Sequence, residues 1–191
     1  MAAYARYEAT FGKDDKPTEN EEPTLEQLSA VAFLIRSGVN PYTDFGVWGP
    51  HGHRILKKAK LLGCIWNNDN PPQLVKVEIH GPASYSMWRA SYIIYMNVMI
   101  MLDAVDLGPL LAYMRKQDAY HEKYGSRVWA LQYQTEVRTR SEHLVRIKRT
   151  AMADYGKELL KYIDWYGSRE KALYNFTHPD DPQRPWNFVF T

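Results

Sequence analysis

The chain has 191 residues, of which 45% are hydrophobic and 14% aromatic, so it contains enough apolar material for one sizeable core. Its 24 basic and 22 acidic residues leave a formal charge of +2, and a single cysteine, Cys64, excludes any intramolecular disulfide. No apolar stretch reaches the roughly 20 residues of a membrane span. The composition therefore predicts an intracellular protein, cytoplasmic or nuclear, without a membrane partner.

The first 30 residues are acidic, with three basic and seven acidic side chains. This charge, together with the prolines, predicts a flexible, solvated arm over residues 1–23. Thr24 and Gln27 then form the Thr-x-x-Gln pattern of a capping box, which predicts a first helix from residue 24 that ends near Gly38.

The next segments combine chain breakers with apolar residues. Residues 40–53 hold two prolines and three glycines, which predicts an ordered loop clamped by its aromatic side chains. Helical spacing from Arg54 to Leu62 predicts a short basic helix. Alternating apolar residues then predict a β-hairpin around residues 63–80.

Three further helices follow in the pattern. Ser84 is a suitable cap for a very apolar helix that runs to Asp103, and we expect this helix to be central. Pro109 suits the first turn of a helix over about residues 107–124, which Gly125 ends. From Ser126 the sequence predicts a long basic helix.

That basic helix, residues 126–149, has the most informative sequence. It carries six basic and two acidic residues, a net charge of +4. Apolar residues recur on it at helical spacing: Trp129, Tyr133, Val137, Leu144 and Ile147. We expect this apolar side to pack and the arginines on the remaining faces to meet an acidic partner.

The end of the chain differs from the rest. Residues 178–185 are proline-rich, and Trp186, Phe188 and Phe190 then alternate with other residues. We expect residues 178–191 to form an aromatic tail that docks on the core or on a partner. The elements together predict a mainly α fold, a single domain of five to seven helices over residues 24–177 with one β-hairpin insert.

Few residues point to catalysis. His51, His53 and His80 are candidate metal ligands, but no cysteine pair or carboxylate completes a recognised spacing. The glycines of the same loop match no nucleotide-binding pattern, and Cys64 lies in a predicted strand, where a buried and inert thiol is expected. We therefore expect no catalytic residues, no metal and no cofactor.

Basic residues in two segments are candidates for binding phosphates, because lysine and arginine neutralise a nucleic-acid backbone while aromatic rings stack on bases. The candidates are Arg138, Arg140, Arg146, Lys148 and Arg149 in the basic helix, with Arg54, Lys57, Lys58 and Lys60. RNA or single-stranded DNA is the expected ligand. An alternative is a solvated helix face whose charges pair with Glu136, Glu142 and the acidic arm.

Several sequence blocks resemble a domain that recurs in predicted proteins of dinoflagellate algae. These blocks are PYTDFGVWGPHGHRILKK, YGSRVWALQYQTEVRTRSEHLVRIKR and DDPQRPWNFVF, and their order covers roughly residues 40–190. The resemblance implies an association with retroelements and a nucleoprotein-like or capsid-like role, but no activity and no functional residues. Capsid domains of retroelements are nearly all helical, so the expected hairpin departs from that pattern.

The leading hypothesis is a non-enzymatic, nucleic-acid-associated or self-assembling structural domain. Two alternatives stay open. One is a protein-interaction or oligomerisation module that does not bind nucleic acid and uses the tail with Trp186, Phe188 and Phe190. The other is a metal- or phosphate-dependent enzyme that uses the loop with His51 and His53.

Overall fold

The computed structural model describes residues 2–37, 41–50, 59–67 and 73–141, with the backbone alone for residues 2, 59–67 and 73–80. Its elements follow in the order α1, α2, β1, β2, α4, α5 and the 3₁₀ turn η1, after which a further helix occupies residues 129–141. The expected mainly helical character is confirmed. The predicted boundary at residue 177 and the tail of residues 178–191 lie outside the described part.

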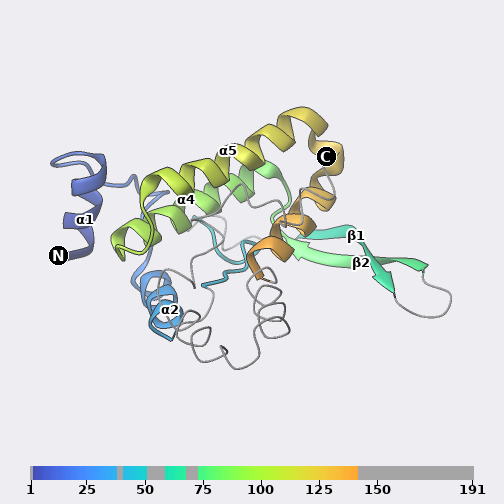
Figure 1. Ribbon diagram of the computed structural model, residues 1–191, viewed down its shortest axis with the longest axis horizontal. Helices are drawn as coiled ribbons and strands as arrows, with labels where there is room; N and C mark the ends of the chain where they lie inside the picture. The colour runs from blue at the N-terminus through green and yellow to red at the C-terminus, as the bar shows by residue number, and fades with distance from the viewer. Residues whose placement is uncertain (1, 38–40, 51–58, 68–72, 142–191) are drawn as a thin grey trace, which may run out of the picture.

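Helix α4, Tyr85–Met101, forms the centre of the molecule, as predicted (Figure 1). The Ser84 hydroxyl accepts a hydrogen bond from the Met87 amide at 3.3 Å and caps the helix. Helices α1, α2 and α5 all contact α4, which explains why most of its side chains are buried.

Helix α5, Leu107–Tyr124, lies beside α4 along the upper part of Figure 1. The Tyr92 hydroxyl donates a hydrogen bond to the Leu110 carbonyl at 2.9 Å, and the Tyr92 and Tyr113 rings stack at 5.5 Å. Gly125 ends α5 with a φ of 72°, a conformation that glycine adopts without strain. The predicted stop at Gly125 is thereby confirmed.

A stack of aromatic rings joins these two helices. Tyr85 stacks on Trp88 at 5.6 Å, Trp88 on Tyr92 at 5.1 Å, and Tyr92 on Tyr113. Offset and edge contacts between aromatic rings each add about 0.5–1.5 kcal/mol to what burial alone provides. The high aromatic content of the sequence therefore serves the core at this place.

Helix α2, Leu25–Arg36, begins at the capping box that the sequence predicts. The Gln27 amide donates to the Thr24 hydroxyl at 3.3 Å, and the Thr24 amide donates to the Gln27 side-chain oxygen at 2.9 Å. Val31, on the inner side of α2, is fully buried. This side of α2 packs towards α4, while Leu25 and Phe33 face outwards.

The first residues correct the prediction of a flexible arm over residues 1–23. Residues 2–11 form helix α1, Ala2–Phe11, which packs on α4. The Arg6 guanidinium donates to the Met101 carbonyl at 3.1 Å, and Tyr7 is buried. Further along, the side-chain amide of Asn97 donates to the Glu21 carbonyl at 3.0 Å. The sequence does not indicate these contacts, because only a few side chains in an otherwise polar, acidic segment make them.

Strands β1, Ala59–Asn67, and β2, Gln73–Gly81, pair antiparallel, with Ala59 opposite Gly81 and Asn67 opposite Gln73. The sequence predicts a helix over residues 54–62, but residues 59–62 belong to β1. Pairing with β2 supplies the backbone hydrogen bonds that a short helix would otherwise make. Residues 54–58 lie outside the described part.

The loop of residues 41–50 closes over the core, as its aromatics predict. Phe45 and Trp48 are buried, and both rings make edge contacts with Tyr95. The Tyr95 hydroxyl donates to the Pro41 carbonyl at 2.7 Å. This arrangement brings the loop against the helix of residues 129–141, where the candidate basic residues begin.

Candidate functional site

The apolar side of the helix over residues 129–141 packs as expected, but its charged residues do not all face solvent. Trp129 and Tyr133 are buried. Arg140, a candidate phosphate ligand, is also buried, with 1% of its surface exposed. A phosphate outside the protein therefore cannot reach its guanidinium, and the prediction for Arg140 is wrong.

The Arg140 guanidinium is occupied by groups of the protein itself. Its Nε and Nη2 donate to the two carboxylate oxygens of Glu136, one turn earlier. Its Nη1 donates to the Thr43 carbonyl at 2.7 Å. The guanidinium carbon lies 3.8 Å from the centre of the Phe45 ring and 4.9 Å from that of Tyr42. Arg140 thus fastens the loop of residues 41–50 to the helix.

The protonation states around Arg140 agree with this structural role. Burial alone would lower the pKa of Arg140, but the Glu136 carboxylate outweighs burial and raises it. Burial raises the pKa of the Tyr95 and Tyr133 phenols well above the ordinary value. The phenols therefore stay neutral and Arg140 stays charged at neutral pH, which suits a fixed clamp better than an acid or base.

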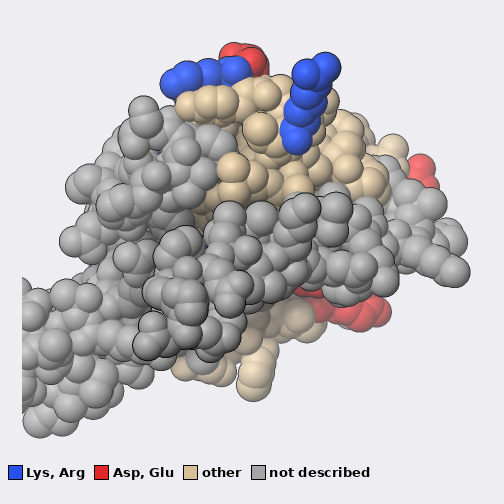
Figure 2. Space-filling view, turned by 90° about the vertical axis from the view of Figure 1, so that its right-hand side faces the viewer, with Lys and Arg blue, Asp and Glu red and all other residues tan. Residues whose placement is uncertain are grey.

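A second set of basic side chains is exposed along the upper edge of the molecule. Arg115 and Lys123 lie on α5, and Arg127 lies in η1, Ser126–Val128. We call these three residues the basic edge. Figure 2 shows Lys and Arg side chains standing out from this edge, over α5, with an acidic side chain beside them. A surface of this kind can attract phosphates.

Neighbouring charges limit the size of the basic edge. Arg89 of α4 is exposed, but its Nε lies 3.6 Å from the Asp118 carboxylate. Lys116 is half-buried, which removes it from the edge; its ammonium lies 5.9 Å from the centre of the Tyr120 ring, and that of the exposed Lys123 lies 5.1 Å from the centre of the Tyr124 ring. Arg138 is half-buried.

Charge density along the sequence does not indicate Arg115 and Lys123. Asp118 and Glu122 lie between them, so α5 shows no basic run. The available signal was spacing: eight residues are about two helical turns, which places Arg115 and Lys123 on the same broad side.

The remaining candidates cannot be placed. Arg54, Lys57, Lys58, His51 and His53 lie outside the described residues, as do Arg146, Lys148, Arg149, Trp186, Phe188 and Phe190. Lys60 is in β1 and His80 in β2, where the backbone alone is described. Within the described part, no group of three or more His, Cys, Asp or Glu side chains is arranged to hold a metal ion.

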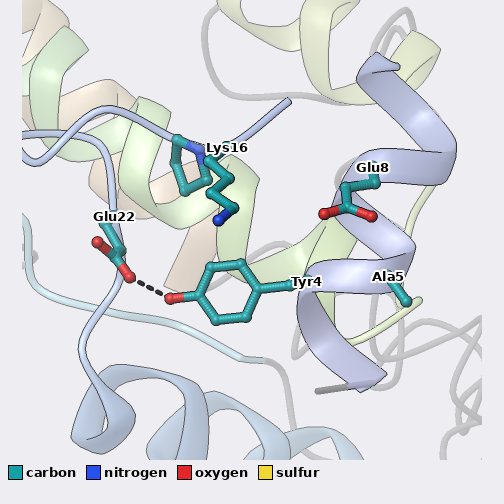
Figure 3. A pocket seen from close by; sticks show the side chains of 6 residues that line it. Tyr4, Ala5, Glu8, Lys16 and Glu22 are labelled. Atoms are coloured by element: carbon teal, nitrogen blue, oxygen red, sulfur yellow. Dashed lines mark hydrogen bonds between the residues drawn. The ribbon is translucent and has the colours of Figure 1, made fainter. Parts of the chain in front are cut away.

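A pocket of about 730 Å³ opens between α1 and the segment that follows it. We call it the N-terminal pocket; its lining residues are Tyr4, Ala5, Glu8, Lys16, Pro17 and Glu22 (Figure 3). Its volume falls in the range of small-molecule and side-chain binding sites. The acidic, proline-containing sequence of this region predicts a solvated arm and gives no signal of a pocket.

Comparison with protein-family models, curated proteins and solved structures finds no match for this chain. The helices in the described part are all too short or too polar to cross a membrane.

Proposed function

We propose that the chain is a non-enzymatic structural domain that associates with nucleic acid, in a nucleoprotein-like or capsid-like role. The observation that supports this proposal is the basic edge, where Arg115, Lys123 and Arg127 are all exposed. Three such side chains neutralise a few phosphates and give sequence-independent binding. Arg146, Lys148 and Arg149 follow in the sequence and remain candidates for extending the surface.

A salt series tests the proposal. Binding of a labelled single-stranded RNA to the full chain, followed by fluorescence anisotropy, should weaken steeply between about 50 and 200 mM salt. The double variant Lys123→Ala/Arg127→Ala should bind more weakly and lower the slope of log affinity against log salt by about 1–2, since about one unit is lost per phosphate contact.

A matched control removes the same charge elsewhere. Lys13 and Arg36 are exposed and lie outside the basic edge, so Lys13→Ala/Arg36→Ala changes the net charge equally. We expect this variant to keep the slope of the unchanged chain. Equal losses in both double variants, or no binding of RNA even at about 50 mM salt, would overturn the proposal.

One observation favours a second candidate, a protein-interaction module. Leu25 and Phe33 of α2 are 75% and 69% exposed. Two large apolar side chains on the outer side of one short helix are suited to a protein partner. If this second function is correct, Phe33→Ser should reduce self-association measured by light scattering and leave RNA binding unchanged; an unchanged mass would count against it.

A further inference from the structure

The N-terminal pocket is built by two short segments that are each fastened to α4. On one side, the Arg6 guanidinium donates to the Met101 carbonyl at the end of α4, and Tyr7 is buried against Phe11. On the other side, the Asn97 amide of α4 holds the Glu21 carbonyl at 3.0 Å, and Pro17 is buried. The pocket therefore exists before any partner arrives, which reduces the entropy lost on binding.

The lining of the pocket is suited to a cation. Glu8 and Glu22 supply carboxylates from opposite sides, and the Tyr4 ring lies between them (Figure 3). The Tyr4 hydroxyl donates to Glu22, and this bond is the main reason that the pKa of Tyr4 is raised. The phenol stays neutral and fixed, so its ring can receive a cation while the carboxylates neutralise the charge.

The position of Lys16 indicates which kind of chemical group fits the N-terminal pocket. The Lys16 side chain points towards the Tyr4 ring and lines the same pocket as Glu8 (Figure 3). The side chain is otherwise exposed and reaches this position from the rim. Lys16 thus stands where an incoming lysine or arginine side chain would place its charge, and an incoming cation would displace it.

Charge is divided between the two ends of the molecule. Residues 2–36 carry seven acidic and four basic side chains, and two of the acidic ones, Glu8 and Glu22, line the pocket. The exposed Lys123 and Arg127 lie where α5 ends and η1 follows, on the right of Figure 1, whereas α1 lies on the left. One copy therefore cannot place its own Lys123 or Arg127 in its own pocket, but a second copy can.

We propose that the N-terminal pocket binds a lysine or arginine side chain from the Lys123–Arg127 end of a second copy of this chain. The proposal rests on the capsid-like role in the proposed function, which requires copies of the chain to assemble, and not on nucleic-acid binding. Each copy then offers one pocket and one basic end, so the contact is head-to-tail. Because the charges are partly solvated, the association is weak and sensitive to salt.

Single substitutions in the pocket give opposite expected effects. Sedimentation velocity of the full, nuclease-treated chain at about 50 mM salt measures self-association without nucleic acid. Glu8→Gln should weaken the association about two- to fivefold, the range of one exposed ion pair. Lys16→Gln should strengthen it, since the competing ammonium is removed. Glu19→Gln, which removes a carboxylate outside the pocket lining, should change the dissociation constant less than Glu8→Gln.

Mixing two complementary variants tests the head-to-tail geometry. A Glu8→Lys chain has a blocked pocket and an intact basic end, while a Lys123→Ala/Arg127→Ala chain has an intact pocket and no basic end. Each alone should sediment as a monomer, and an equimolar mixture should give dimers and no longer species. Monomers in the mixture, or a Lys16→Gln variant that associates more weakly than the unchanged chain, would overturn the inference.

Head-to-tail association and nucleic-acid binding can be refuted independently of each other. The Glu8→Lys chain should still bind single-stranded RNA at least as tightly as the unchanged chain, because its basic edge is intact. If the unchanged chain binds RNA but stays monomeric across the concentration range, head-to-tail association is refuted and the nucleic-acid function stands. If the unchanged chain associates but does not bind RNA, the nucleic-acid function is refuted and head-to-tail association stands.

Discussion

The centre of the molecule and its N-terminal end treat charged side chains in opposite ways. At the centre, Arg140 and Glu136 are both about 1% exposed and pair with each other beneath the loop of residues 41–50. At the N-terminal end, Glu8 and Lys16 line an open pocket. Charge density in a sequence therefore does not by itself indicate a binding surface. Whether a charged side chain is accessible depends on which segments pack over it.

The largest expected effect comes from breaking the central ion pair. Arg140→Ala leaves the Glu136 carboxylate buried without its partner and should lower the free energy of unfolding by about 3–5 kcal/mol. Arg127→Ala, at the exposed basic edge, should change it by no more than about 0.5 kcal/mol. Urea denaturation of both variants measures the contrast, and equal losses would remove the distinction between the two arginines.

Replacing both members of the ion pair tests whether the unpaired Glu136 carboxylate causes the loss of stability in Arg140→Ala. Arg140→Met with Glu136→Leu removes both charges and leaves no carboxylate stranded, so it should destabilise less than Arg140→Ala. The hydrogen bond to the Thr43 carbonyl is lost in both variants, whereas the bond that the Tyr113 hydroxyl donates to Glu136 is lost only in the double variant. A double variant as unstable as Arg140→Ala would show that removing the buried, unpaired carboxylate does not compensate for the lost Tyr113 bond.

A smaller effect should come from Gly81, where the end of β2 meets the helix of residues 129–141. A Cβ atom on Gly81 would lie 2.1 Å from the Tyr133 ring, which is fully buried and cannot move freely. Gly81→Ala should therefore destabilise the fold by about 1–3 kcal/mol in thermal or urea unfolding. Gly108→Ala is the matched control, because a Cβ there meets no atom within 4 Å; a similar loss in both would contradict the expectation.

The capping box of α2 should contribute about 1 kcal/mol. Thr24→Ala removes the hydroxyl that accepts from the Gln27 amide and should lower the free energy of unfolding by that amount. Thr24→Ser keeps the hydroxyl and should retain most of the stability. If Ser and Ala at this position prove equally destabilising, the methyl group of Thr24, and not its hydrogen bond, is responsible.

The smallest effect at neutral pH concerns the buried phenols. Burial raises the folded-state pKa of Tyr95 and Tyr133, so their contribution is constant below the unfolded pKa of about 10. Above that pH the unfolded chain ionises first, and stability falls as pH rises. Phenolate absorbance should therefore increase in two stages, with the later one coinciding with loss of helical circular dichroism; a single stage in the folded protein would contradict this.

Local signals in the sequence were sufficient for several elements. The side chains of Thr24 and Ser84 satisfy amides of the next turn, and Gly125 adopts a positive φ, so each boundary depends on neighbours within a few residues. The apolar content of residues 85–101 likewise indicates a central helix. These features do not require knowledge of distant contacts.

The candidate site could not be predicted in the same way, because distant segments determine it. The burial of Arg140 depends on Thr43 and Phe45, nearly 100 residues earlier in the chain. The N-terminal pocket depends on α4, which holds Arg6 through the Met101 carbonyl. In both cases the sequence around the residue resembles a solvent-exposed surface. Only its contact with a distant segment of the chain shows that it belongs to a packed structure.

The aromatic stack of Tyr85, Trp88, Tyr92 and Tyr113 also gives the protein an optical signature. Rings held this close in fixed orientations, at 5.1–5.6 Å between centres, should produce strong near-ultraviolet circular dichroism. The signal originates where α4 meets α5 and is remote from the carboxylates of the N-terminal pocket. It therefore reports whether a surface variant has kept its tertiary packing before its binding is interpreted.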